Sequence, residues 1–377
     1  MADRPLRCAF LVQGEGRGHM TQALAVEEIL REAGHEVCGI FVGTSELRAP
    51  PGFFTEGTRA PVTTYTTPVL VPDRHDRGMS VAATALHNAL RFPVYVWSGV
   101  RIAWRLRRLR PDLIVNFFDL VSAIAVAILL PTTPTVAVGH HFLLTHPEFP
   151  RPPGRTPGWL GLRLLTWICG LGVRARLALS FRELEDPAPR TRVVPPLLRE
   201  AITDAVPEEG EHVLVYLLNP GYAPELNAWH QGNRHVPVRV FMDRSATAPE
   251  SGHENLSFRP LDGEGFIEAL RTCRGLATTA GFEAVCEAMY LDKPVLLVPT
   301  EGHVEQACNA LDAEAAGAGI VRARFDLDAF LEYLPRHRKI GDRFRDWVRS
   351  APDRVLRELE SAAFGRSLSP SQRARNA

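Results

Sequence analysis

The segment from Thr278 to Ala310 constrains the fold of this chain more than any other, because strand, turn and helix patterns follow one another within it. It begins as the end of a strand, turns at a glycine, continues as a helix and a buried strand, and then opens a second helix. Gly281 stands directly before the first helix, where unpaired backbone N–H groups and the helix dipole form an anion site. The other polar groups of the segment lie on the two helices: Glu287, Glu305, Gln306 and Asn309. Together these groups suit the phosphates, ribose and hexose of a nucleotide diphosphate sugar.

The same segment resembles the donor-binding region of the GT-B glycosyltransferases. It is most similar to the branch of the UDP-glycosyltransferases and of the peptidoglycan N-acetylglucosaminyltransferase that makes lipid II. The family pattern is a small polar residue, two glycines, a helix with a Glu, a G-x-P turn, a buried strand ending in Pro, and D/E-Q-x-x-N-A. The chain has the matching residues in the same order: Gly281, Glu287, Lys293-Pro294, Pro299 and Glu305-Gln306-x-x-Asn309-Ala310.

Two departures from the family pattern concern the phosphate contacts. Ala280 replaces the first family glycine, while Glu283 and Ala284 stand where many members carry Asn or Gln and Ser or Thr. A carboxylate at Glu283 would repel a diphosphate unless it faced away or bonded a hydroxyl.

The resemblance implies an α/β protein of the GT-B type, with two Rossmann-like domains whose parallel sheets face an interdomain cleft. It implies a donor site in which Glu287 accepts hydrogen bonds from both ribose hydroxyls and the Glu305–Gln306 pair binds the sugar. The donor-binding residues expected in this way are Gly16, Gly18, Thr279, Gly281, Glu287, Glu305, Gln306 and Asn309.

Length and hydrophobic pattern agree with two domains. The chain has 377 residues, of which 45% are hydrophobic, and a strand–turn–helix–strand rhythm opens it and returns in its second half. We expect an acceptor-binding domain over 1–195 and a nucleotide-sugar-binding domain over 205–345. The resemblance implies that a C-terminal helix at 346–366 crosses back to the first domain, and the composition of 367–377 predicts a disordered tail.

Charge and cysteine content exclude several classes. The formal net charge is zero, so no nucleic-acid partner is expected. The six cysteines are scattered, which indicates free thiols in a reducing cytoplasm rather than a set of disulfides or a zinc site. No signal peptide and no apolar run of about 20 residues is seen, so a membrane span is not expected. The near absence of lysine indicates a high-GC, bacterial genome.

The glycine-rich turn at 14–19 is the first candidate for catalysis. It follows the first strand and ends in His19, and an imidazole with a pKa of about 6.5 suits removal of a proton from a hydroxyl. In several UDP-glycosyltransferases the matching histidine is the general base, and the resemblance carries that role to His19. The alternative is a tight turn that needs glycine for its backbone freedom.

Two further strand ends carry candidate catalytic side chains. His140 and His141 follow a buried strand of the first sheet and are placed to face the same cleft, although they would equally cap the next helix or pack on Phe142. Asp119 ends another strand and would orient a histidine or bind the acceptor, or else serve as the N-cap of the following helix.

The sequence therefore predicts an inverting, metal-independent glycosyltransferase that moves a sugar from a nucleotide-sugar donor, most simply a UDP-sugar, to a hydroxyl acceptor without a cofactor. The acceptor class stays open between a small molecule, a glycan and a lipid-linked molecule, and the oligomeric state is not predicted. A UDP-sugar 2-epimerase and a non-catalytic nucleotide-sugar-binding protein remain alternatives.

One segment bears on where the protein works. The stretch 97–110 holds five arginines between tryptophan and aliphatic residues, and 159–173 is apolar with Arg163. These stretches would form a patch for anionic lipid, which would place a cytoplasmic protein at the inner face of the membrane. The favoured alternative is an amphipathic helix with its apolar face toward the core and a solvated outer face.

Overall fold

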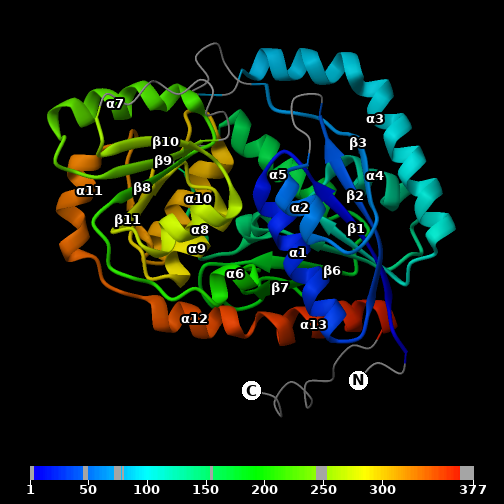
Figure 1. Ribbon diagram of the computed structural model, residues 1–377. Helices are drawn as coiled ribbons and strands as arrows, with labels where there is room; N and C mark the ends of the chain where they lie inside the picture. Colours follow the sequence, from blue (N-terminus) through cyan, green and yellow to red (C-terminus); the bar gives the residue numbers. More distant parts are fainter. Residues whose placement is uncertain are drawn as a thin grey trace.

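The computed structural model describes residues 4–45, 50–71, 78, 80–152, 156–242 and 253–365. The predicted tail at 367–377 lies outside these residues. Within them the chain forms two parallel sheets, one in each half, flanked by helices (Figure 1).

The first sheet has seven strands in the order β3-β2-β1-β4-β5-β6-β7, and every pairing is parallel. Its central strands β1, β4 and β5 are buried on both faces, which is why they read as continuous apolar runs. The strands are β1 (Arg7–Gln13), β2 (Glu36–Thr44), β3 (Val62–Thr66), β4 (Leu113–Phe117), β5 (Thr135–Val138), β6 (Ala175–Leu179) and β7 (Thr191–Val194).

The second sheet has six strands in the order β10-β9-β8-β11-β12-β13, again all parallel. The strand order reverses beside β1 in the first sheet and beside β8 in the second, and ligands of such sheets bind at these reversals. The strands are β8 (Val213–Leu217), β9 (Val238–Met242), β10 (Leu256–Pro260), β11 (Gly275–Thr278), β12 (Val295–Leu297) and β13 (Gly319–Val321).

The helices cover both faces of each sheet. Those of the first half are α1 (Arg17–Glu32), α2 (Gly52–Gly57), α3 (Val81–Leu109), α4 (Leu120–Leu129), η1 (His140–Thr145), α5 (Pro157–Cys169) and α6 (Glu200–Thr203). Those of the second half are η2 (Pro220–Tyr222), α7 (Ala223–Gly232), α8 (Gly263–Arg271), α9 (Phe282–Tyr290), α10 (Val304–Ala315), α11 (Leu327–Tyr333), η4 (Leu334–Arg336), α12 (Gly341–Arg349) and α13 (Ala351–Phe364). None of the described helices is both long and apolar enough to cross a bilayer.

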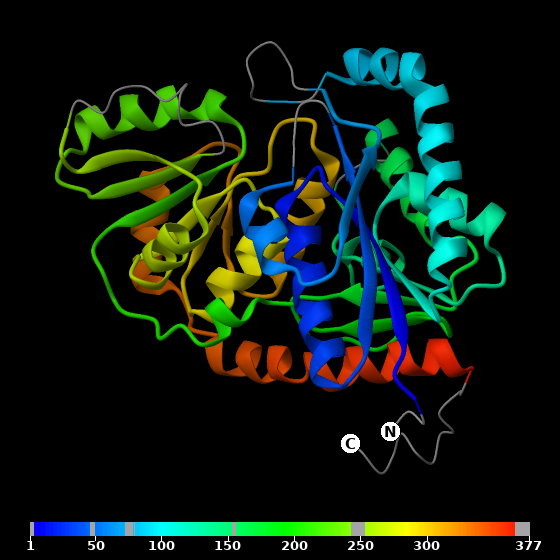
Figure 2. The same cartoon turned by 45° about the vertical axis from the view of Figure 1, so that its right-hand side comes forward.

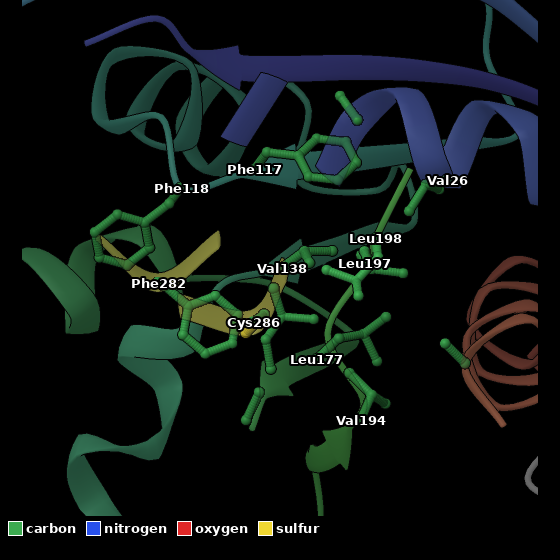
Figure 3. Close-up of a cluster of buried hydrophobic side chains, with 14 of the residues drawn as sticks. Val26, Phe117, Phe118, Val138, Leu177, Val194, Leu197, Leu198, Phe282 and Cys286 are labelled. Carbon is green, nitrogen blue, oxygen red and sulfur yellow. The ribbon is translucent and has the colours of Figure 1, made fainter. Parts of the chain in front are cut away.

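The hydrophobic core runs without a break from the first sheet into the second. Phe282 and Cys286 of α9 belong to the same buried cluster as Val138 of β5 and Leu177 of β6 (Figure 3). Apolar contact therefore holds α9, which begins at the predicted anion site, against the first half of the molecule.

The last two helices run along one side of both halves, as both ribbon views show (Figures 1 and 2). In α12, the indole Nε1 of Trp347 donates to the carbonyl of Ser180, at 3.0 Å. In α13, Val355 and Leu359 are fully buried, and the helix packs on α1 and on strands β4 to β7. The end of the chain thus contacts the first half of the molecule.

Candidate active site

A cavity of about 270 Å³ lies where the carboxyl ends of the two sheets face each other. Its walls come from the loop after β1, from η1, and from the amino ends of α8, α9 and α10. It collects ten of the site residues predicted from sequence: Gly16, Gly18, His19, His140, His141, Gly281, Glu287, Glu305, Gln306 and Asn309.

Asp119 and Thr279 are the two predicted residues that do not line the cavity. Asp119 is fully buried as the N-cap of α4: its Oδ1 accepts from the backbone N of Ser122 at 2.8 Å, and its Oδ2 accepts from Thr67 Oγ1 at 3.3 Å. Burial raises the pKa of this carboxyl. The structure therefore gives Asp119 the capping role that the sequence left open as an alternative, and it buries Thr279 beneath the turn that precedes α9.

Two helix amino ends, one from each domain, meet at the cavity. The N-cap of α1 is Gly16 and that of α9 is Gly281, and neither N-cap has a side chain that could accept a hydrogen bond from its helix. The approach is close, because a Cβ added to Gly18 would lie 2.9 Å from Cγ of Glu283. The backbone N–H groups of two first helical turns and two positive dipole ends therefore face the same space, which favours an anion there.

The turn before α9 is strained at the position where the family has glycine. Ala280 has a φ of 60°, in the left-handed region that costs a residue with a Cβ about 1 kcal/mol or more. Asn309 Nδ2 donates to the carbonyl oxygen of Ala280 at 3.3 Å. Asn309 thus supports the anion-binding turn as well as lining the cavity.

His19 is oriented by a hydrogen-bonded chain that crosses between the domains. Gln22 Nε2 donates to Glu283 Oε1 at 2.6 Å, so its other end, Oε1, faces His19 Nδ1 at 3.3 Å. Nδ1 then carries the proton and Nε2 keeps a lone pair. The pKa of His19 is lowered to about 4, mainly by burial and then by the neighbouring His141. The imidazole is therefore neutral at neutral pH.

Glu283 lines the cavity at the amino end of α9, at the position that departs from the family pattern. It is buried, and its Oε2 has no hydrogen-bond partner among the described residues. Burial is the main cause that raises the pKa of Glu283 to about 8. The carboxyl is thus largely neutral at neutral pH, and the repulsion of a diphosphate expected from the sequence is weakened.

Phe118 does not line the cavity but packs on a histidine that does, a contact that the sequence did not reveal. It follows β4 with a φ of 59°, and this strained backbone brings its ring into parallel contact with His141, with ring centroids 3.8 Å apart. His141 Nε2 lies 3.2 Å from Glu305 Oε2, across the cleft. Burial alone would raise the pKa of Glu305, but His141 holds it below its ordinary value.

His140 lies deeper and supports the wall of the cavity. Its Nδ1 donates to the carbonyl of Leu179 at 2.8 Å, its ring stacks on Phe282 at 4.3 Å, and its Nε2 lies 3.6 Å from Asp312 Oδ2. Burial lowers the pKa of His140 to about 3 and raises that of Asp312 to about 6. The sequence placed His140 at the cleft but did not reveal Asp312, because that residue lies on the inner side of α10.

Glu287 is held by an arginine that no sequence pattern singled out. Arg199 Nε donates to Glu287 Oε1 at 2.9 Å, and its Nη2 lies 2.7 Å from the same oxygen. Arg199 also lines the cavity, so it brings positive charge to the predicted donor site. Gln306 is fixed in a similar way, since its Oε1 accepts from the backbone N of Thr300 at 2.8 Å.

The comparisons with known proteins identify the family and the fold. The family model described as glycosyl transferase family 1 matches residues 107–336. No curated protein sequence matches the chain.

Solved structures share the fold over almost the whole chain. The calicheamicin glycosyltransferase CalG4 is 20% identical, with a TM-score of 0.59 over 97% of this chain and all of that one. UGT89C1 of Arabidopsis thaliana, solved with quercetin, is 13% identical, with a TM-score of 0.62 over 96% of this chain and 99% of that one. MurG of Acinetobacter baumannii is 15% identical, with a TM-score of 0.52 over 94% of this chain and 99% of that one. The predicted GT-B fold is confirmed, and the chain belongs to glycosyl transferase family 1 as a glycosyltransferase.

Proposed function

We propose that this enzyme transfers a sugar from a UDP-sugar to a hydroxyl acceptor, with inversion at the anomeric carbon and without a metal ion. The observation that carries the proposal is the meeting of two uncapped helix amino ends, one from each domain, in the cavity that also contains Glu287. The donor would bind mainly to the second domain, 205–345, and the acceptor to the first, 1–195.

In this arrangement the diphosphate lies against the backbone amides beside Gly281. The positive ends of α9 and α1 offset its charge, and Arg199 adds a full positive charge. Charge on the departing diphosphate is therefore balanced by the protein itself, which is the basis for proposing transfer without a metal.

The ribose and the sugar would bind to side chains that already have defined positions. Glu287 accepts hydrogen bonds from the two ribose hydroxyls. Its carboxylate either keeps its ion pair with Arg199 or loses it when Arg199 turns to the phosphates. Glu305 and Gln306, at the amino end of α10, bond the sugar hydroxyls. Glu305 lies beside His141, so the transferred sugar lies close to the first domain.

His19 is the proposed base. The acceptor oxygen attacks the anomeric carbon from the face opposite the diphosphate, the carbon–oxygen bond to the diphosphate breaks, and the hydroxyl proton passes to Nε2 of His19. One displacement of this kind inverts the anomeric configuration. Gln22 supports the step by holding the proton of the ring on Nδ1.

Calorimetry with a panel of UDP-, TDP- and GDP-sugars tests the donor. We expect heat of binding for a UDP-sugar and a loss of at least about tenfold in affinity for Glu287→Ala, whereas Glu332→Ala, an exposed glutamate on α11, binds as wild type. Absence of binding for every nucleotide sugar, or equal affinity of both variants, contradicts the proposal.

Two further measurements test the chemistry once an acceptor is found. NMR of the product should show an anomeric configuration opposite to that of the donor, and the rate should be unchanged in EDTA. Retention of configuration excludes the single displacement, and loss of activity in EDTA excludes transfer without a metal.

A further inference from the structure

The outer face of α3, α4 and α5 is strongly apolar, although it is exposed among the residues that the structure describes. Thirteen of the fifteen exposed large hydrophobic side chains among the described residues lie on these three helices, and only Leu70 and Val206 lie elsewhere. Trp97 and Trp104 of α3 are 61% and 52% exposed, and Trp167 of α5 is 60% exposed. The sequence favoured a helix with its apolar face toward the core and a solvated outer face. Ile102 and Leu106 of α3 are indeed buried, but the outer face carries exposed tryptophans as well as arginines.

We define the outer surface as the exposed side chains of these three helices. Figures 1 and 2 show α3 along the outer edge of the first domain, with α4 beside it, away from the second domain. Contiguous apolar surfaces of this kind mark sites of interaction with a protein or a membrane, because a soluble monomer rarely exposes them without a partner.

The charges of the outer surface have one sign. The sequence contains no Asp or Glu between Gly78 and Pro111, within 120–147, or within 149–182. The same helices carry arginines whose side chains are exposed or partly exposed: Arg101, Arg105, Arg107, Arg108 and Arg163. The guanidinium of Arg108 lies 3.5 Å from the ring centroid of Trp104, so charge and aromatic surface are presented side by side.

From this combination we infer that the outer surface is a docking face for a membrane rich in anionic lipid. Tryptophan and aliphatic side chains enter the boundary between headgroups and acyl chains, while arginines pair with lipid phosphates. A second copy of the chain fits less well, because a two-fold contact through this face would bring two acid-free, arginine-bearing surfaces together. The inference does not rest on the proposed donor or reaction.

The position of the outer surface keeps the cavity accessible on a membrane. Gly78, just before α3, pairs by a backbone bridge with Glu301, in the loop before α10. At the start of α5, a Cβ added to Gly158 would lie 2.6 Å from Val304 Cγ2. The amino ends of α3 and α5 therefore reach the edge of the cleft, while the rest of α3 runs along the outer edge of the first domain (Figures 1 and 2). Docking would place the cleft beside the bilayer without closing it.

Flotation with lipid vesicles tests the inference directly, because it needs neither donor nor acceptor. At about 0.1 M salt, the wild-type protein should float with vesicles that contain phosphatidylglycerol and remain unbound with phosphatidylcholine alone. We expect Trp97→Ser/Trp104→Ser to lower the vesicle partition coefficient, obtained from the fraction bound over a series of lipid concentrations, at least about tenfold. Arg101→Gln/Arg105→Gln should lower it about 25-fold, since each basic residue near an anionic surface contributes about fivefold.

Matched controls lie outside the outer surface. Val206→Ser removes an apolar side chain that is 72% exposed, and Arg338→Gln removes an exposed charge near the end of η4. Both should bind vesicles within about twofold of wild type. All variants should melt as wild type does, because every substituted side chain is exposed or partly exposed.

Three results overturn the inference. One is the absence of flotation with anionic vesicles, and another is flotation of the double Trp variant at the wild-type level. The third is a dimer, seen by light scattering, that Trp97→Ser/Trp104→Ser converts to a monomer; this result assigns the surface to a second copy. Calorimetry with UDP on the same samples tests the donor proposal separately, because UDP binding does not involve the outer surface.

Discussion

At the scale of single residues, the site is built from side chains that hold one another across the cleft. Gln22 joins His19 of the first domain to Glu283 of the second. Leu has a volume similar to that of Gln22 but cannot accept the hydrogen bond from His19 Nδ1, so the ring proton is no longer held on that nitrogen. We therefore expect Gln22→Leu to lower kcat about tenfold to a hundredfold with little change in donor affinity. Steady-state kinetics checks this against Glu32→Leu, an exposed position of α1. A wild-type kcat for Gln22→Leu would remove Gln22 from the mechanism.

The charge of Glu283 makes a separate prediction for stability. Its pKa rises from an ordinary value of 4.5 to about 8 in the folded protein, so folding takes up a proton between these values. Stability from this carboxyl is present at low pH and is lost as pH rises toward 8, by at most about 1.4 kcal/mol per pH unit. The side chain of Glu283→Gln cannot titrate. As the pH rises from 4.5 to about 8, the free energy of unfolding of this variant should therefore increase relative to that of wild type. Urea unfolding at several pH values measures the difference, and parallel curves for the two proteins contradict the raised pKa.

Residue types could be predicted from the sequence where one motif carries them, but their partners could not. Glu287 and Glu305 follow from the family pattern, whereas Arg199 and His141 meet them only through the fold. Phe118 gave no signal, because its role depends on a positive φ that a phenylalanine rarely adopts.

At the scale of elements, the residue at which a helix begins could be predicted more securely than the face of the helix that is buried. The helices predicted from the donor motif begin at Phe282 and Val304, where a glycine or a polar turn ends the preceding segment. The periodicity of α3, by contrast, could not show which of its faces is covered. Two apolar faces were available, and only the packing of α3 on the sheet and α4 decides which is exposed.

The amino end of α9 gives a prediction that separates binding from folding. Gly281 has φ −68° and ψ 134°, which any residue adopts, and a Cβ added there meets no atom within 4 Å. Gly281→Ala should therefore keep its stability within about 0.5 kcal/mol, while its methyl group fills the space beside the amides and weakens UDP binding at least about tenfold. Gly232→Ala, equally open but outside the cavity, is the control. UDP binding by Gly281→Ala at wild-type strength would place the diphosphate elsewhere.

At the scale of the whole molecule, the cavity exists only because the two halves are held together. Contacts from Gln22 to Glu283 and from His141 to Glu305 join residues more than 150 positions apart. Such pairings cannot be read from local pattern, so the two-domain layout could be predicted from the sequence but not the fit between the domains. The continuous core around Phe282 supplies the apolar contact that keeps these polar pairs in register.

The C-terminal helix α13 should be a large contributor to the stability of the first domain, although it follows the second in sequence. Leu359 is fully buried against that domain, and Glu360 beside it lies 3.2 Å from His35 Nε2. Leu359→Ala should lower the free energy of unfolding by about 2–5 kcal/mol, because it leaves a cavity between α13 and the sheet. Arg357→Ala, exposed on the same helix, should change it by less than about 0.5 kcal/mol, so a larger effect of Leu359→Ala reflects lost packing rather than the presence of an alanine in α13. Urea unfolding followed by tryptophan fluorescence compares the two, and equal midpoints would mean that α13 rests on the first domain without stabilising it.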